Sequence, residues 1–146
     1  MSAEKEKAAI VHLDNADENL AELARCALEG KERALPLYSK FYVGAAIRTK
    51  DGQIYNAGNI ECSSYGLTTC AERIALFKAL SENERQFDAV VIATDTDAFC
   101  PPCGACRQVL WDFAPDIIVY SMNSKLMIKK ELLRDLLPNA FDAQLL

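Results

Sequence analysis

The sequence predicts an α/β domain in which one mixed, five-stranded sheet is covered by helices. Helical and extended patterns alternate along the chain in the order α, β, β, α, β, α, β, β, α, which is typical of a layered α/β domain. A continuous apolar run over residues 89–94 predicts a central strand that is covered on both faces. The chain has 146 residues and a hydrophobic fraction of 51 %, so we expect one domain over residues 1–146 with a sizeable core.

The amino-terminal part is expected to contain an arm and a helix. We expect residues 1–12 to form a loose arm. Leucine and alanine recur at helical spacing over residues 17–29, which predicts a helix with one apolar face. Asp14 or Asn15 is expected to cap this helix, and Gly30 is expected to end it.

A hairpin and a second helix are expected next. Residues 42–49 and 53–58 have the pattern of strands, and the Asp51-Gly52 pair between them is typical of a hairpin turn. A helix is predicted over residues 69–81, where apolar residues again recur at helical spacing.

The carboxyl-terminal part adds three strands and two helices to the prediction. The apolar run over residues 89–94 is followed by a helix over 103–113 and a strand over 117–121. A turn then leads into a short strand over 126–128 and a last helix over 130–137. A proline follows each of these two helices within two residues and prevents its continuation.

Composition excludes several classes of protein. The formal net charge is −5 and no basic run is present, so we expect no binding to nucleic acid or to a membrane. Residues 1–9 lack the apolar region of a secretory signal, and no apolar run approaches the roughly 18 residues of a membrane span. We therefore expect a cytoplasmic protein with reduced cysteines. The only histidine, His12, lies in the expected arm, which argues against a Ser–His or Cys–His catalytic site.

Two short segments, residues 69–73 and 102–108, carry the chemistry of the chain. Together they contain three thiols, from Cys70, Cys103 and Cys106. Three thiolates can hold a zinc ion and leave its fourth position open, as a catalytic zinc site requires. Cys103 and Cys106 are three residues apart, so one turn of helix would direct both at the same point.

Two charged residues close to Cys70 complete this pattern. Glu72 would close the site if it were a fourth ligand, so its better role is to take a proton from the water that zinc activates and pass it to the substrate. Arg73 can offset part of the negative charge of the thiolates by donating a hydrogen bond to a ligand sulfur. The order of the segments resembles the signature of zinc deaminases in its all-cysteine form.

Two other interpretations of the cysteines stay open. Cys100 could supply a fourth thiolate and make a closed, structural zinc site in a non-catalytic binding module. Cys103 and Cys106 could instead form a redox pair. We favour catalytic zinc because neither alternative explains Glu72, and we expect Cys62 and Cys100 to be bystanders.

From about Asn15 to Phe141, the chain resembles the small, homotetrameric cytidine deaminases that hold zinc with three cysteines. The resemblance implies a three-layer α/β/α fold with a five-stranded mixed sheet, one Zn²⁺ per subunit and a nucleoside substrate. It also implies hydrolytic deamination of cytidine and deoxycytidine to uridine and deoxyuridine, with release of ammonia, in pyrimidine salvage. The resemblance depends on residues 38–46, 59–61, 69–73, 102–109 and 136–141.

The resemblance also assigns roles to individual residues around the metal. It implies that Cys70, Cys103 and Cys106 are the zinc ligands, that Glu72 transfers protons, and that Arg73 tempers the thiolates.

Further residues correspond to the substrate contacts of the family. Asn59 and Glu61 match the residues that hold the ribose hydroxyls. Phe41 matches the residue that packs on the pyrimidine ring, and the backbone of Ala71, with Glu72, reads the edge of the base. The residues that correspond to those reaching into a neighbouring subunit's site are Ser63, Tyr65 and Phe141.

Two features bear on the substrate. Asn is common in the family where this chain has Cys62, next to the residues expected at the ribose. Residues 43–52 also resemble blasticidin-S deaminases, which act on a cytosine-bearing antibiotic. Deamination of that antibiotic is therefore the alternative function. Arg73 and the segment 59–61 fit the nucleoside enzymes better. Relatives that act on nucleotides or tRNA usually have His where this chain has Cys70.

Overall fold

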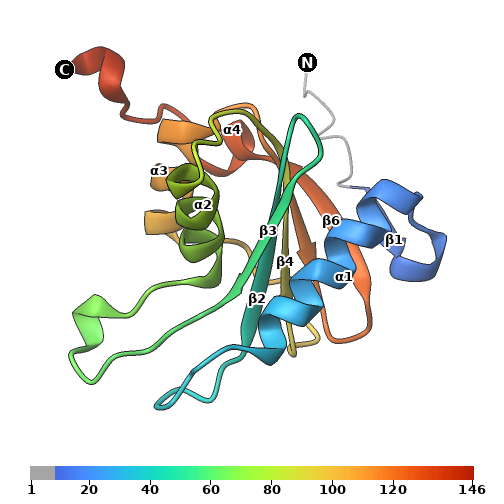
Figure 1. The fold of residues 1–146 in the computed structure, drawn as a ribbon. Helices are drawn as coiled ribbons and strands as arrows, with labels where there is room; N and C mark the ends of the chain where they lie inside the picture. Colours follow the sequence, from blue (N-terminus) through green and yellow to red (C-terminus); the bar gives the residue numbers. More distant parts are fainter. Residues whose placement is uncertain (1–8) are drawn as a thin grey trace, which may run out of the picture.

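The computed structural model describes residues 9–146, which form a six-stranded sheet with helices on both faces (Figure 1). In chain order the elements are β1 (Ile10–His12), η1 (Leu13–Asn15), α1 (Glu18–Glu32), β2 (Val43–Thr49), β3 (Ile54–Gly58), η2 (Tyr65–Leu67), α2 (Ala71–Ser81), β4 (Phe87–Thr94), α3 (Gly104–Phe113), β5 (Ile118–Met122), β6 (Met127–Leu132), α4 (Leu133–Leu136) and η3 (Ala143–Leu145).

The sheet is mixed, with the strand order β1-β6-β5-β4-β2-β3. β4 lies inside the sheet, where it pairs in parallel with β5 and antiparallel with β2. The other neighbouring strands pair antiparallel. Because β4 and β5 run in parallel, the chain between them must cross over one face of the sheet, and α3 makes this crossover.

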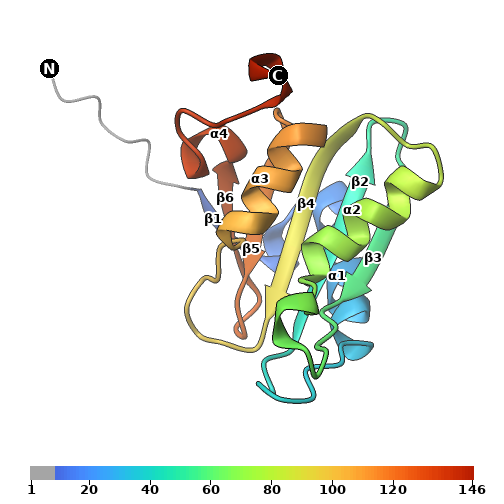
Figure 2. The same ribbon diagram turned by 90° about the vertical axis from the view of Figure 1, so that its left-hand side faces the viewer.

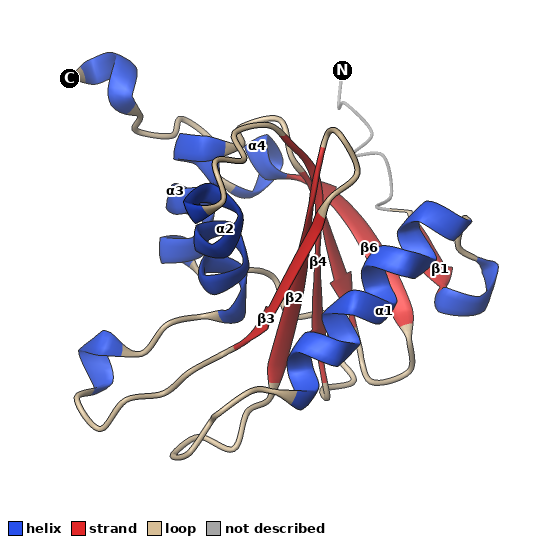
Figure 3. Cartoon of the chain, viewed as in Figure 1, coloured by secondary structure: helices blue, strands red, loops and turns tan. Residues whose placement is uncertain are grey.

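The helices form two layers around the sheet, as the prediction of three layers requires. α1 covers one face, and α2, α3 and α4 cover the other (Figure 3). Val91 packs in the core on the α1 side, together with Leu23, and Ile92 packs in the core on the opposite side, together with Leu76 and Leu110. Alternate residues of β4 are therefore buried on opposite faces, which confirms the central strand predicted from its apolar run.

The topology brings the starts of α2 and α3 to one edge of the sheet. β2 begins where β4 ends, because Val43 pairs with Thr94. The segment before α2 is held near this edge by an isolated bridge between Ile60 and Thr69. α3 follows the loop that leaves the carboxyl end of β4, and the two helices lie side by side on this face of the sheet (Figure 2).

The prediction of five strands is wrong, because β1 is a sixth. β1 pairs antiparallel with β6, and it lies within residues 1–12, for which a loose arm was expected. Residues 1–8 of that segment lie outside the described residues. β6 is longer than the predicted strand over 126–128 because β5 pairs with it as far as Leu132, whereas β1 pairs only with residues 127–129. α4 is correspondingly shorter than the helix predicted over 130–137.

The prediction for α1 is wrong at both of its caps. The helix is capped by Asp17, whose carboxylate accepts a hydrogen bond of 2.9 Å from the amide of Leu20. It continues past Gly30, which lies against β3 so closely that a Cβ atom there would be 2.5 Å from the carbonyl oxygen of Ala57. Gly30 thus allows the close packing of helix on strand instead of ending the helix. The other predicted elements before β6 agree within two residues at each end.

Within residues 9–146, every helix is too short or too polar to cross a membrane.

Candidate metal centre and active site

Three thiols meet at the starts of α2 and α3. Cys70 is the residue before the first turn of α2, Cys103 holds the same position at α3, and Cys106 lies in the first turn of α3. The Sγ atoms of Cys70 and Cys103 are 3.8 Å apart, and those of Cys103 and Cys106 are 3.6 Å apart. All three sulfurs lie within 4.8 Å of one another, so the structure brings together the three residues predicted as metal ligands.

The spacing of these sulfurs fits a zinc ion. Tetrahedral zinc with Zn–S bonds of about 2.3 Å holds its sulfurs about 3.8 Å apart. Cys106 is fully buried, whereas Cys103 is exposed. Among the described residues the thiol cluster contains three cysteines and not Cys100, so a closed site with four thiolates is not formed. The donor set is thus that of a catalytic site with one open position.

The environment of the cluster stabilises a thiolate at neutral pH. The pKa of Cys70 is lowered to about 5, first because the Cys106 thiol donates a hydrogen bond to it and further because Arg73 and Cys103 do the same. The same interaction with Cys70 is the main reason that the pKa of Cys106 is raised, and burial acts in the same direction. Both helix starts also favour negative charge. The cluster is therefore prepared to bind a cation.

Arg73 lies against the ligand sulfurs. Its Nη2 atom donates a hydrogen bond of 3.5 Å to the Sγ atom of Cys70. The contact with Cys70 is the main reason that the pKa of Arg73 is raised, and Cys106 adds to it. The Nε atom of Arg73 is buried and has no hydrogen-bond partner among the described residues. Its guanidinium group is thus directed at the Cys70 sulfur.

Glu72 is a buried carboxyl group beside the thiols. Its side chain comes from the first turn of α2, and the residue is 5 % exposed. Burial raises the pKa of Glu72 to about 7, and the charge of Cys70 acts in the same direction. A carboxyl group with a pKa near neutrality can both accept and release a proton at physiological pH.

A cavity of about 160 Å³ opens beside Glu72 and the thiols. It contains six of the residues expected in the site and six for which no role in the cavity was predicted. The expected residues are Phe41, Asn59, Cys70, Ala71, Glu72 and Cys103. The additional lining residues are Val43, Thr68, Thr69, Ile92, Cys100 and Pro101.

The sequence carried only weak signals for the additional lining residues. Val43 and Ile92 belong to strands, and a strand pattern does not show which residues lie beneath two helix starts. Cys100 was expected to be a bystander; it does not join the thiol cluster, but it lines the cavity. Cys100 is three residues before Cys103, and this short spacing was the one sequence signal that could have predicted its place in the cavity lining.

Asn59 lines the cavity and binds the backbone of two other lining residues. It is 8 % exposed, and its side-chain oxygen accepts a hydrogen bond of 3.0 Å from the amide of Val43. Its Nδ2 atom donates one of 2.9 Å to the carbonyl of Phe41. Asn59 therefore fixes the backbone on both sides of Tyr42, and an amide group keeps one further donor and one further acceptor for a ligand.

Glu61 does not line the cavity but organises the loop next to it. Its carboxylate accepts hydrogen bonds of 2.9 Å from the amides of Tyr38 and Ser39 and one of 2.6 Å from the Ser39 hydroxyl. The hydrogen bond from the Ser39 hydroxyl is the main reason that the pKa of Glu61 is lowered. Glu61 is thus ionised and fixed in place near Phe41.

The three residues expected to serve a neighbouring subunit lie outside the cavity. Ser63, Tyr65 and Phe141 are exposed, with Tyr65 at 72 % and Phe141 at 55 %. The ring of Tyr65 contacts that of Tyr38, with centroids 5.4 Å apart. Large exposed aromatic side chains of this kind are typical of surfaces that contact another chain.

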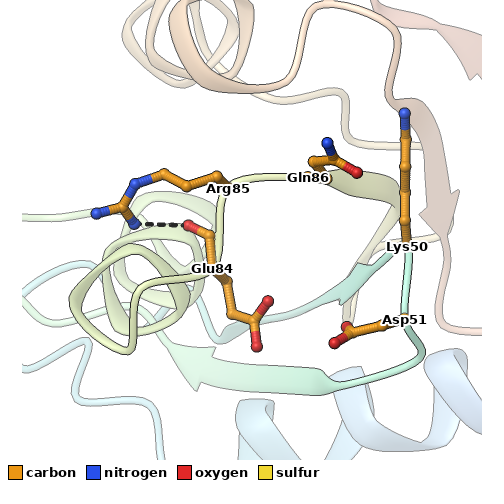
Figure 4. A pocket seen from close by; sticks show the side chains of 5 residues that line it. All are labelled: Lys50, Asp51, Glu84, Arg85 and Gln86. Atoms are coloured by element: carbon orange, nitrogen blue, oxygen red, sulfur yellow. Dashed lines mark hydrogen bonds between the residues drawn. The ribbon is translucent and has the colours of Figure 1, made fainter.

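A larger cavity of about 380 Å³ lies at the opposite end of β2. Figure 4 shows the side chains around it, which come from the β2–β3 turn and from the segment between α2 and β4. The lining combines two cations with two carboxylates, and none of its members is buried. The residues are Lys50, Asp51, Glu84, Arg85 and Gln86. This cavity has no metal-ligand cluster and no buried acid or base, so the smaller cavity is the candidate active site.

Comparison with known proteins agrees with this geometry. Residues 17–122 match the family model of the cytidine and deoxycytidylate deaminase zinc-binding region. The chain is 47 % identical over 123 residues to a cytidine deaminase of Halalkalibacterium halodurans. The aligned residues cover 84 % of this chain and 93 % of that protein. It is 38 % identical over 118 residues to the blasticidin-S deaminase of Bacillus cereus, covering 73 % and 83 % of the two chains.

A solved structure has the same fold. The crystal structure of cytidine deaminase from Burkholderia pseudomallei superimposes with a TM-score of 0.80 at 41 % identity, covering 82 % of this chain and 97 % of that chain. The matched segment 17–122 includes the three clustered thiols and Glu72, and the cluster is that of a zinc cofactor site. This chain therefore belongs to the family of zinc-dependent cytidine and deoxycytidylate deaminases.

Proposed function

We propose that this protein hydrolyses the exocyclic C–N bond of cytidine and deoxycytidine. Water is consumed, and uridine or deoxyuridine and ammonia are released. The observation that carries the proposal is that three clustered thiols and a buried carboxyl group with a pKa of about 7 adjoin one cavity. The cytidine deaminases among its relatives support the choice of substrate.

Zinc is proposed to be held by Cys70, Cys103 and Cys106. When bound, zinc supplies a Lewis acid that activates a water molecule for attack on C4 of the pyrimidine ring. Arg73 keeps the thiolates from neutralising too much of the metal's charge, because its guanidinium group donates a hydrogen bond to the Cys70 sulfur. Cys100 does not take part in metal binding in this proposal.

Glu72 is proposed to carry the protons of the reaction. As a carboxylate, it accepts a proton from the attacking water and donates it to N3 of the ring. It then takes the second proton of that water, from the hydroxyl group now on C4, and transfers it to the amino group. The C4–N bond breaks, ammonia departs and the C4 carbonyl forms. A pKa of about 7 suits this role because the carboxyl group must both gain and lose a proton in each turnover.

The nucleoside is proposed to lie with its base in the cavity and its sugar toward the loop that Glu61 organises. Phe41 is 36 % exposed and lines the cavity, so its ring can pack on the pyrimidine. The backbone of Ala71, at the start of α2, is proposed to contact the edge of the base. Asn59 and Glu61 are proposed to bind the ribose hydroxyls, using the hydrogen-bonding capacity that remains after their bonds within the protein.

We further propose a homotetramer of single-domain subunits that share active sites. The cavity of about 160 Å³ is smaller than the roughly 300 Å³ at which small-molecule pockets usually begin, so one subunit supplies only part of a nucleoside site. The exposed residues Ser63, Tyr65 and Phe141 are proposed to complete the site of a neighbouring subunit. The six free cysteines support action in the reducing cytoplasm, in pyrimidine salvage.

A blasticidin-S deaminase is the second candidate, because one such enzyme is 38 % identical to this chain. A side-by-side assay with cytidine, deoxycytidine, cytosine, cytidine monophosphate and blasticidin S separates the possibilities by the change in ultraviolet absorbance. We expect high activity on both nucleosides and very low activity on cytosine, since buried polar groups that lack their hydroxyl partners disfavour it. We expect rejection of the monophosphate, because a net charge of −5 and Glu61 offer no phosphate site.

Best activity on blasticidin S would assign the chain to the antibiotic-degrading enzymes. Best activity on free cytosine would show that Asn59 and Glu61 do not bind a sugar.

A further inference from the structure

The helix that carries two metal ligands also holds the carboxyl-terminal segment of the chain. Cys106, Arg107 and Gln108 are consecutive residues of α3. Cys106 is buried in the thiol cluster. Arg107 and Gln108 donate hydrogen bonds to backbone carbonyl groups of the segment 136–141, which runs from α4 past α3 (Figures 1 and 2).

Arg107 connects this segment to the loop in front of the metal ligands. Its Nε atom donates a hydrogen bond of 2.8 Å to the carbonyl of Pro102, which directly precedes Cys103. Its Nη1 atom donates one of 2.7 Å to the carbonyl of Leu136, at the end of α4. Both contacts are partly buried, which shields them from water. One guanidinium group therefore joins the turn that presents Cys103 to the start of the carboxyl-terminal segment.

Gln108 holds the same segment five residues further along. Its Nε2 atom donates a hydrogen bond of 2.8 Å to the carbonyl of Phe141, and another of 3.3 Å to the Oδ1 atom of Asp112 orients the amide. The backbone carbonyl of Phe141 is thus anchored while the residue as a whole is 55 % exposed. The next residue, Asp142, caps η3 by accepting a hydrogen bond of 2.9 Å from the amide of Gln144. A fixed backbone with a free ring suits a residue that contacts another chain.

We infer that Arg107 and Gln108 are positioning residues that tie the segment 136–141 to the metal-binding helix and hold Phe141 in the orientation that substrate binding requires. This inference rests on the proposed function and on the proposed role of Phe141 in a neighbouring subunit's site. Neither residue lines the cavity, so both act through the segment and not on the nucleoside.

Gln108→Met gives the main test, because methionine keeps the length of the side chain and removes the donor. With the zinc-loaded protein, we expect the KM for cytidine to rise about three- to tenfold, as for the loss of one hydrogen bond, with kcat and zinc content unchanged. Hydrogen exchange of the amides in residues 137–146 should accelerate by a similar factor. Gln86→Met is the matched control, since Gln86 is exposed at the opposite end of β2 (Figure 4).

Arg107 provides the second variant. Arg107→Met should accelerate exchange in residues 137–146 and raise KM as well, and Arg107→Lys should restore part of both effects because it retains a donor. Arg85→Met is its matched control: Arg85 also donates to two carbonyl groups, those of Leu80 and Glu84, at 2.8 and 2.7 Å, but remote from the thiols.

The outcomes separate this inference from the proposed function. If the unmodified protein does not deaminate cytidine, the proposed function fails, and hydrogen exchange alone still decides whether the segment is anchored. If it does deaminate cytidine and Gln108→Met changes neither exchange nor KM relative to Gln86→Met, the anchoring is refuted. Faster exchange with an unchanged KM would show that Gln108 is merely structural and would overturn its positioning role.

Discussion

At the scale of single residues, charge balance decides how the site works. Three thiolates exceed the charge of one Zn²⁺, and Arg73 is the residue placed to offset the excess, with its Nη2 atom 3.5 Å from the Cys70 sulfur. This contact is the main reason that the pKa of Arg73 is raised. The pKa of Cys70 is lowered first by the hydrogen bond from Cys106, and the contact with Arg73 adds to this effect. In the proposed mechanism, Arg73 therefore acts on the metal through the thiolates.

Arg73→Ala should shift the pH dependence of the reaction. Without the guanidinium group the thiolates donate more negative charge to zinc, and the water that zinc activates becomes less acidic. The pH at which activity rises should therefore move upward, turnover at neutral pH should fall, and zinc content should stay nearly unchanged. A pH–rate profile beside a zinc determination checks this. An unaltered profile would mean that Arg73 has no influence on the metal.

Residue types at fixed spacing were the most predictable part of the site. Cys70, Cys103 and Cys106 meet as expected because two helix starts and one helical turn define their positions. The cavity lining was less predictable. Val43 and Ile92 line it because of where two strands pass beneath the helices, which is a tertiary property and leaves no local pattern.

At the scale of elements, glycines allow α1 to pack closely against the strands. Gly44 in β2 lies against α1, where a Cβ atom would be 2.0 Å from the carbonyl oxygen of Ala27. Gly30 makes the same kind of approach from the helix toward β3. The sequence suggested that Gly30 ends the helix, because a glycine that stops a helix and one that allows close packing look alike until the partner strand is known.

Gly44→Ala should destabilise the protein. The added methyl group meets backbone atoms that cannot rotate away, and overpacking of this kind typically costs about 1–3 kcal/mol. For a chain of this size this corresponds to a fall in Tm of roughly 2–12 °C. Gly66→Ala is the control, because a Cβ atom there meets nothing within 4 Å. Equal melting temperatures for the two variants would contradict the packing described for β2 and α1.

The edge strands were the elements that sequence patterns missed. β1 has three residues, too few to show alternation, and it is a strand because β6 offers it an open edge. β6 in turn extends to Leu132 because β5 pairs with it over that length. The pairing of β1 with β6 joins distant parts of the chain, so the order of helices and strands was predictable but the number of strands was not.

At the scale of the whole molecule, the chain presents a small cavity beside the thiols and several exposed aromatic residues. Tyr65 and Phe141 are 72 % and 55 % exposed, and neither lines the cavity of its own subunit. A tetramer in which each subunit completes a neighbour's site accounts for both observations. In such a tetramer the affinity for nucleoside depends on the association of the subunits, because residues of two chains form each site. Zinc binding depends only on the thiols of one chain.

Removal of residues 139–146 tests this dependence. The truncated protein should keep its zinc, because none of the clustered thiols is removed, and should bind nucleoside more weakly, because Phe141 is lost. Inhibitor binding, zinc content and molar mass in solution are the measurements. A truncated protein that is monomeric and fully active would rule out shared sites.

Glu72→Gln tests the central claim, that a carboxyl group beside a three-thiol zinc site moves the protons of nucleoside deamination. Glutamine keeps the shape and the hydrogen-bonding capacity of the side chain but cannot carry a proton. The measurement is kcat for cytidine, with zinc content determined on the same sample. We expect zinc to be retained and kcat to fall by at least about 10²–10⁴-fold, the usual contribution of general acid–base catalysis. A Gln variant that deaminates cytidine at close to the normal rate would contradict the mechanism.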